Sequence, residues 1–100
     1  MMKTGKQHET SIRITNSHAV DITIVIEPWG EIYELVPADR LDVVAEGPDG
    51  GALEVDFQAG KVIVWAWPGS TVRLFRDGVE IGGDRTRSPS ASAYPPTSVH

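Results

Sequence analysis

Apolar and polar residues alternate along most of this chain, in short runs rich in β-branched and aromatic side chains. From Leu53 to Gln58 every second residue is apolar and each residue between is Glu, Asp or Gln. Because successive side chains of a strand point to opposite faces, this pattern is typical of strands with one buried and one solvated face. The runs predict strands at 10–16, 19–27, 31–36, 40–46, 52–58, 61–67, 71–76 and 79–81.

Turn residues separate these runs at short, regular intervals. Pro28 ends one run, since proline cannot donate a hydrogen bond to a neighbouring strand. Residues 47–51 read Gly-Pro-Asp-Gly-Gly, a strong loop signal, and Asp77–Gly78 predicts a type I′ hairpin. The spacing predicts an all-β fold, namely a small antiparallel two-sheet β-sandwich of seven or eight strands. A small closed β-barrel is the alternative.

Composition places one domain at 10–83, between a polar N-terminus at 1–9 and a Ser/Pro-rich tail at 84–100. The tail has almost nothing to bury, so it is expected to be disordered. The 100 residues include no cysteine, which favours a reducing compartment. The N-terminus has no apolar signal-peptide core, and no apolar stretch is long enough to span a bilayer. We therefore expect a cytoplasmic protein without a membrane partner.

Acidic residues are concentrated in the middle of the chain. The formal net charge is −5, but residues 21–56 hold ten acids and a single base, Arg40. This balance argues against a nucleic-acid partner, because binding a phosphate backbone needs clustered Lys and Arg. The acids are expected to form a solvated surface, with a cation or a basic partner as the alternatives.

The histidines do not suggest catalysis. His8 is near the N-terminus, His18 is in a predicted turn, and His100 is the last residue, so no two have the spacing of metal ligands. None of them accompanies a serine in a nucleophile-like setting. The sequence therefore predicts that this protein is not an enzyme and has no cofactor.

Three aspartates form a candidate calcium site. Asp39 and Asp42 are close in sequence to Asp49 in the Gly-rich loop, and hard cations prefer several carboxylate oxygens from flexible loops. No D-x-D-x-D-G pattern accompanies them.

Aromatic side chains are the candidates for a binding surface. Trp65 and Trp67 are both expected on the face of their strand opposite Val64, either in the core or in an exposed apolar strip that monomers rarely show. Trp29 and Tyr33 join them as candidate binding residues. If the turns at Trp29 and Trp67 share one end of the fold, they could frame a platform for a sugar ring.

Two motifs carry a resemblance. The segment 27–37 reads Glu-Pro-Trp-Gly-Glu-Ile-Tyr-Glu-Leu-Val-Pro, and 65–70 reads Trp-Ala-Trp-Pro-Gly-Ser. Together they resemble a group of short bacterial proteins with E-P-W-G-E-x-Y-x-L and W-x-W-P-G-S motifs. The resemblance covers about residues 10–82 and implies a bacterial origin and an all-β domain, but no activity. One departure is Ala38, where the group's turn would have glycine.

The strand rhythm also resembles that of cupredoxin and immunoglobulin sandwiches. The copper site of a cupredoxin needs a cysteine, which this chain lacks, so that chemistry is not carried over. The function predicted from the sequence is a non-catalytic module for protein interaction or for self-association, the latter as a homo-oligomer. The alternative is a domain that binds a carbohydrate or a cation.

Overall fold

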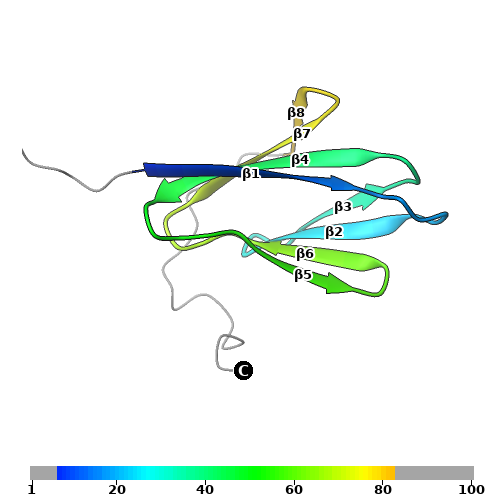
Figure 1. Cartoon of the computed structure of the whole chain (residues 1–100), viewed down its shortest axis with the longest axis horizontal. Coiled ribbons are helices and arrows are strands. Elements are labelled where there is room, and N and C mark those ends of the chain that lie inside the picture. The colour runs from blue at the N-terminus through cyan, green and yellow to red at the C-terminus, as the bar shows by residue number, and fades with distance from the viewer. Residues whose placement is uncertain (1–6, 83–100) are drawn as a thin grey trace, which may run out of the picture.

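A computed structural model describes residues 7–82 of the chain, which form eight strands (Figure 1). The strands are β1 (Gln7–Thr15), β2 (Ile22–Glu27), β3 (Glu31–Leu35), β4 (Arg40–Pro48), β5 (Glu54–Gln58), β6 (Lys61–Trp65), β7 (Thr71–Arg76) and β8 (Val79–Ile81). The expected tail at 84–100 lies outside the described residues.

The strands form two four-stranded sheets, in the orders β1-β4-β7-β8 and β3-β2-β6-β5. The sheets face each other as a sandwich and do not close into a barrel, so the sandwich prediction is confirmed. Each sheet ends in an edge strand on both sides, and these edges are β1, β8, β3 and β5.

The core lies between the sheets and is built from alternate residues of the inner strands. Ile24 and Ile26 of β2 are completely buried, as are Leu41 and Val43 of β4 and Val64 of β6. Burying each of these side chains contributes roughly 1.5–3 kcal/mol relative to leaving it in water. The apolar alternation in the sequence therefore marks the inward face of each sheet.

One strand pair is parallel, which the predicted antiparallel sandwich did not include. β2 pairs with β6 in the same direction, with Thr23 opposite Lys61 and Glu27 opposite Trp65. The amide of Ala66 continues this pairing by donating to the carbonyl of Glu27 at 2.9 Å. Because the two strands run in parallel, the turns that follow them lie at the same end of the sandwich.

Several predicted strand boundaries differ from the structure, and the start of β1 and the end of β6 are two of them. β1 begins at Gln7, not at residue 10, because residues 46–48 of β4 offer its polar first residues an antiparallel partner. β6 ends at Trp65, because Ala66 and Trp67 are both buried and break the alternation of the strand. The Asp77–Gly78 turn is confirmed, since both residues have the positive φ of a type I′ hairpin, at 53° and 79°.

The turn between β3 and β4 places alanine where glycine is preferred. The amide of Asp39 donates to the carbonyl of Val36 at 3.0 Å, and Pro37 and Ala38 are the central residues. Ala38 has a φ of 71°, the left-handed value that a type II turn requires after proline.

The Ala38→Gly variant is therefore expected to be more stable than the native chain by about 0.5–1 kcal/mol. Relief of the left-handed strain on alanine exceeds the entropy that glycine adds to the unfolded chain. Urea unfolding measures the change. Ala59→Gly is the matched control, because Ala59 is also in a turn but has no positive φ, and it should lose stability. Equal effects of the two variants would contradict the strain argument.

Candidate functional site

The outer face of the β3-β2-β6-β5 sheet carries an apolar patch. The strand register aligns Ile32, Val25 and Ile63 across three neighbouring strands, and Trp65 lies two residues beyond Ile63 on the same face. Ile32 is 63% exposed, and the other three side chains are half-buried. We call these four residues the Trp65 strip. This face is turned away from the second sheet.

Carboxylates surround this strip. Glu27 and Glu54 are opposite Trp65 on its two neighbouring strands, and Asp56 is opposite Ile63. Glu34, on β3, accepts a hydrogen bond from the hydroxyl of Thr23 at 3.1 Å. Within the described part of the chain, none of these four acids is in an ion pair. The face presents them with one base, Lys61, so its charge is strongly negative.

Trp67 does not share this face, so the prediction that Trp65 and Trp67 point the same way is wrong. The Trp67 side chain is only 5% exposed and belongs to the core. Its indole N–H donates to the carbonyl of Pro48 at 2.9 Å, and the ring of His8 lies 5.9 Å away, centroid to centroid. A Cβ atom on Gly51 would lie 1.9 Å from the indole, so this glycine is required for the contact.

The other two aromatic candidates also belong mainly to the interior. Trp29 and Tyr33 are half-buried against the core, and the hydroxyl of Tyr33 donates to Glu31 Oε1 at 2.7 Å. The turns at Trp29 and Trp67 do share an end of the fold, because β2 and β6 are parallel. However, the buried indole of Trp67 cannot offer a face to a sugar ring. Of the four aromatic residues singled out from the sequence, only Trp65 lies on the open sheet face.

The three candidate calcium ligands do not converge. Asp39 precedes β4 and Asp49 follows it, so the nine residues of that strand separate them by roughly 30 Å. Asp39 Oδ2 lies 3.5 Å from Arg76 Nε, and Asp42 is bound to Arg13. No three His, Cys, Asp or Glu side chains in the described residues are grouped so that they could hold a metal ion.

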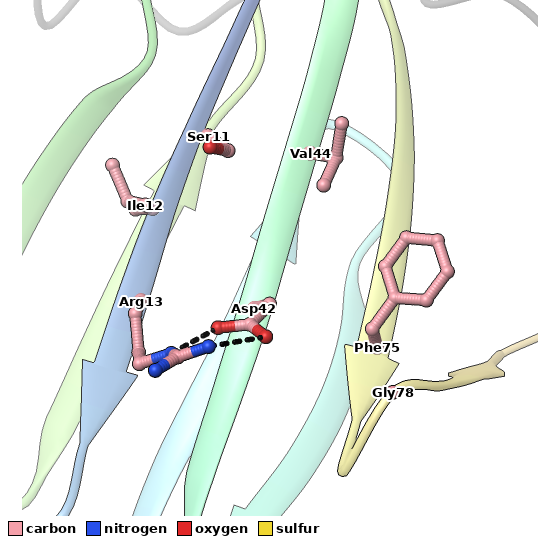
Figure 2. A pocket seen from close by; sticks show the side chains of 7 residues that line it. All are labelled: Ser11, Ile12, Arg13, Asp42, Val44, Phe75 and Gly78. Carbon is pink, nitrogen blue, oxygen red and sulfur yellow. Dashed lines mark hydrogen bonds and ion pairs between the residues drawn. The ribbon is translucent and has the colours of Figure 1, made fainter.

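The opposite outer face, on the β1-β4-β7-β8 sheet, holds a shallow groove of about 610 Å³. Figure 2 shows Arg13 reaching across it from β1 to Asp42 on β4. Arg13 Nε donates to Asp42 Oδ1 at 2.6 Å and Nη2 donates to Oδ2 at 3.2 Å. This bidentate contact lowers the pKa of Asp42, mainly through the hydrogen bond from Arg13. A carboxylate whose pKa is lowered in this way is a weaker base than a free one.

Aromatic and aliphatic side chains line much of the rest of the groove. Phe75 and Val44 line it, and the guanidinium of Arg73 lies 5.2 Å from the centre of the Phe75 ring. Ser11 is the one hydroxyl residue that lines it, and no histidine does. The groove therefore offers no base to activate a nucleophile.

Sequence reasoning missed Ile32. Ile32 is exposed because it points to the outer face of β3, whereas Tyr33 and Leu35 on the same strand point inward. An apolar residue at a position where the pattern calls for a polar one is the signal that could have revealed the strip.

The two histidines in the described residues lie at opposite ends of β1. His8 packs against Trp67, and the amide of His18 donates to Asn16 Oδ1 at 2.9 Å in the turn before β2, while His100 lies outside the described residues. Residues 7–82 contain no helix that could cross a membrane.

None of the protein-family models, curated proteins or solved structures compared with this chain matches it. The resemblance to the bacterial group with E-P-W-G-E-x-Y-x-L and W-x-W-P-G-S motifs accordingly stays a prediction.

Proposed function

We propose that this chain is a non-catalytic interaction module that binds a basic, apolar segment of a partner protein on the Trp65 strip. The observation that carries the proposal is an apolar row on a solvent-facing sheet, bordered by four carboxylates without ion-pair partners in residues 7–82. The partner segment would place apolar side chains over Ile63 and Trp65 and Lys or Arg side chains beside Glu27, Glu54 and Asp56.

Each part of this surface has a physical role in binding. Apolar patches bordered by polar residues mark interaction sites on soluble proteins. Tryptophan is enriched among the residues that dominate binding energy, because it buries a large area with few rotatable bonds. The carboxylates would speed the encounter with a cationic segment and disfavour acidic ones. A neutral or acidic partner would leave the negative charge of the four bordering carboxylates without opposite charges.

The alternatives predicted from the sequence have less support. A sugar platform framed by Trp29 and Trp67 would lack the buried indole face of Trp67, and the calcium candidates lie apart. An interaction surface needs neither of these features, so it remains the better explanation of the strip.

The proposal predicts selective binding of basic peptides. The probes are short synthetic peptides that alternate Leu or Phe with Lys, and a matched set in which Glu replaces each Lys. We expect only the Lys peptides to shift amide NMR signals, and we expect the shifts to cluster at Val25, Ile32, Ile63 and Trp65. The Trp65→Ser variant should weaken binding by about 30-fold or more, since a dominant contact contributes about 2 kcal/mol.

Phe57→Ser is the matched control, because Phe57 is 76% exposed on the adjacent strand β5 but points to the other side of that sheet. It should leave the affinity unchanged. Equal binding of the Lys and Glu peptides, or signal shifts confined to the β1-β4-β7-β8 sheet, would show that the strip is not the binding surface.

A further inference from the structure

The strand β1 leaves a long open edge. It is nine residues long, it ends its sheet, and it contains no proline. An edge strand of this kind presents a row of unpaired amides and carbonyls, which is a template for pairing with another strand. Natural edge strands are usually short or blocked, so an edge of this length calls for an explanation.

The backbone groups that face this edge can be identified. The amide of Asn16 donates to the carbonyl of Asp39, next to the end of β4, and the carbonyl of Asn16 accepts from the amide of Ala38. In an antiparallel pair, alternate residues direct their backbone groups to the same side. The even-numbered residues of β1 therefore face β4. The odd-numbered residues, from Gln7 to Thr15, direct their amides and carbonyls to the open edge.

We propose that β1 pairs with β1 of a second copy of this chain, antiparallel and centred on Ser11. In this register Ser11 is opposite Ser11 of the second copy, and every odd-numbered residue meets another odd-numbered residue. All the outward backbone groups of the strand can then form hydrogen bonds. The β1-β4-β7-β8 sheet of one copy then joins the same sheet of the second copy, and together they form one continuous eight-stranded sheet across a twofold axis.

The charges of β1 are self-complementary in this register. Glu9 comes opposite Arg13 of the second copy, and Arg13 comes opposite Glu9. The twofold axis therefore brings each Arg13 guanidinium, which is bound to Asp42 of its own chain, beside Glu9 of the other chain. Registers centred on Glu9 or on Arg13 would instead oppose like charges, which destabilises a strand pair. Of the registers that pair odd-numbered residues with each other, only the one centred on Ser11 opposes Glu9 with Arg13, and it also aligns the two strands over their whole length.

The pairing also removes two deficiencies of the isolated chain. Glu9 is directly opposite Glu46 on β4, an unfavourable pair of like charges on the same face. Arg13 of the second copy would lie beside Glu9 and offset this repulsion. On the inner face, Ile12 and Ile14 are only half-buried. The second copy would place Thr10 and His8 next to them and extend the cover of the core.

The other described edges do not share this property. On β5, pairing centred on Asp56 would oppose two aspartates. On β3, pairing centred on Tyr33 would oppose Ile32 with Glu34, and β8 is only three residues long. The pairing surface is also separate from the Trp65 strip, so this proposal does not depend on the proposed function.

Analytical ultracentrifugation of the purified full chain tests the pairing, over a range of concentrations into the high micromolar. We expect a reversible dimer, with twice the mass of the chain. In Ser11→Pro, the edge-facing amide is removed while the pairing with β4 is left intact, so the dimer should weaken by at least about tenfold. A native chain that stays monomeric throughout, or a dimer that persists unchanged in a folded Ser11→Pro variant, would overturn the proposal.

Charge reversal tests the register itself. Glu9→Arg alone and Arg13→Glu alone should each weaken the dimer by about tenfold or more, because each opposes like charges across the axis. A mixture of the two variants should restore a heterodimer. The arginine introduced into one chain then meets the glutamate introduced into the other, and the unchanged Arg13 and Glu9 of the two chains also meet.

The control is Glu80→Arg, the same charge change on the far edge strand β8, which should leave the native dimer unchanged. Failure of the mixture to associate, with both variants folded by circular dichroism, would refute the Ser11-centred register.

Discussion

Replacing Trp67 by alanine is expected to destabilise the fold by roughly 3–5 kcal/mol, the usual cost of emptying a buried tryptophan site. The indole closes one end of the core, where it packs against His8 and Gly51 and donates to the carbonyl of Pro48. A domain of this size has a total stability of about 5–15 kcal/mol, so this one side chain accounts for a large part of it. The free energy of unfolding in urea measures the loss.

Trp65→Ala is the matched control, because it removes the same side chain two residues away on the outer face. Its cost should be smaller, about 1–2 kcal/mol, since the side chain is only half-buried. Gly51→Ala should also destabilise the native chain, and it should cost less in the Trp67→Ala background, where the indole no longer meets the added methyl group. Equal losses in Trp65→Ala and Trp67→Ala would contradict the placement of Trp67 in the core.

Replacing Asn16 by aspartate is expected to cost about 3 kcal/mol or more at neutral pH. The side chain is completely buried, and its Nδ2 donates to the carbonyls of Val20 at 2.9 Å and Leu35 at 2.8 Å. A carboxylate cannot donate, so the variant would bury a negative charge against two carbonyl oxygens. Unfolding in urea measures the cost.

The penalty should also depend on pH. Burial and the carbonyl oxygens raise the pKa of an aspartate at this position in the folded state above its value in the unfolded chain. The folded state then binds more protons than the unfolded state, so the variant should lose stability as the pH rises above about 4. Ser17→Asp adds the same charge to the exposed neighbouring position and should change stability little. A penalty for Asn16→Asp that does not depend on pH would contradict the buried-charge argument.

The strands could be predicted because their signals are local. The alternation in 53–58 and the Asp77–Gly78 turn depend only on neighbouring residues. The structure contains both the strand and the turn, but Phe57 of the strand is 76% exposed and not buried as the alternation predicted. The faces of the two tryptophans could not be predicted in the same way. β6 ends at Trp65 because the chain turns inward toward β4, and a two-residue period applies only while the strand continues.

The role of Asn16 was also beyond sequence reasoning. Asparagine in a turn usually bonds to its own backbone neighbours, as Asn16 does with His18. Its bond to Leu35 links two segments that are distant in sequence, and only the fold brings them together. Similarly, the open edge of β1 follows from the strand order, whereas the charges that make it self-complementary are visible in the sequence.

The parallel pairing of β2 with β6 sets the order in which this chain can acquire its structure. The β5–β6 and β7–β8 hairpins have two-residue turns, so they can form within roughly 1–10 microseconds. The β2–β6 pair closes a loop that contains three strands, β3, β4 and β5. The β1–β4 pair closes a loop that contains two strands, β2 and β3. The entropy of closing these long loops is lost before the strand contacts that offset it have formed. Folding is therefore expected to be slow, on the scale of about milliseconds to seconds. Before the two sheets have packed, the open edge of β1 and the apolar faces of both sheets are exposed to solvent at the same time. Dimerisation through β1 at that stage would shield the β1 edge from pairing with other strands.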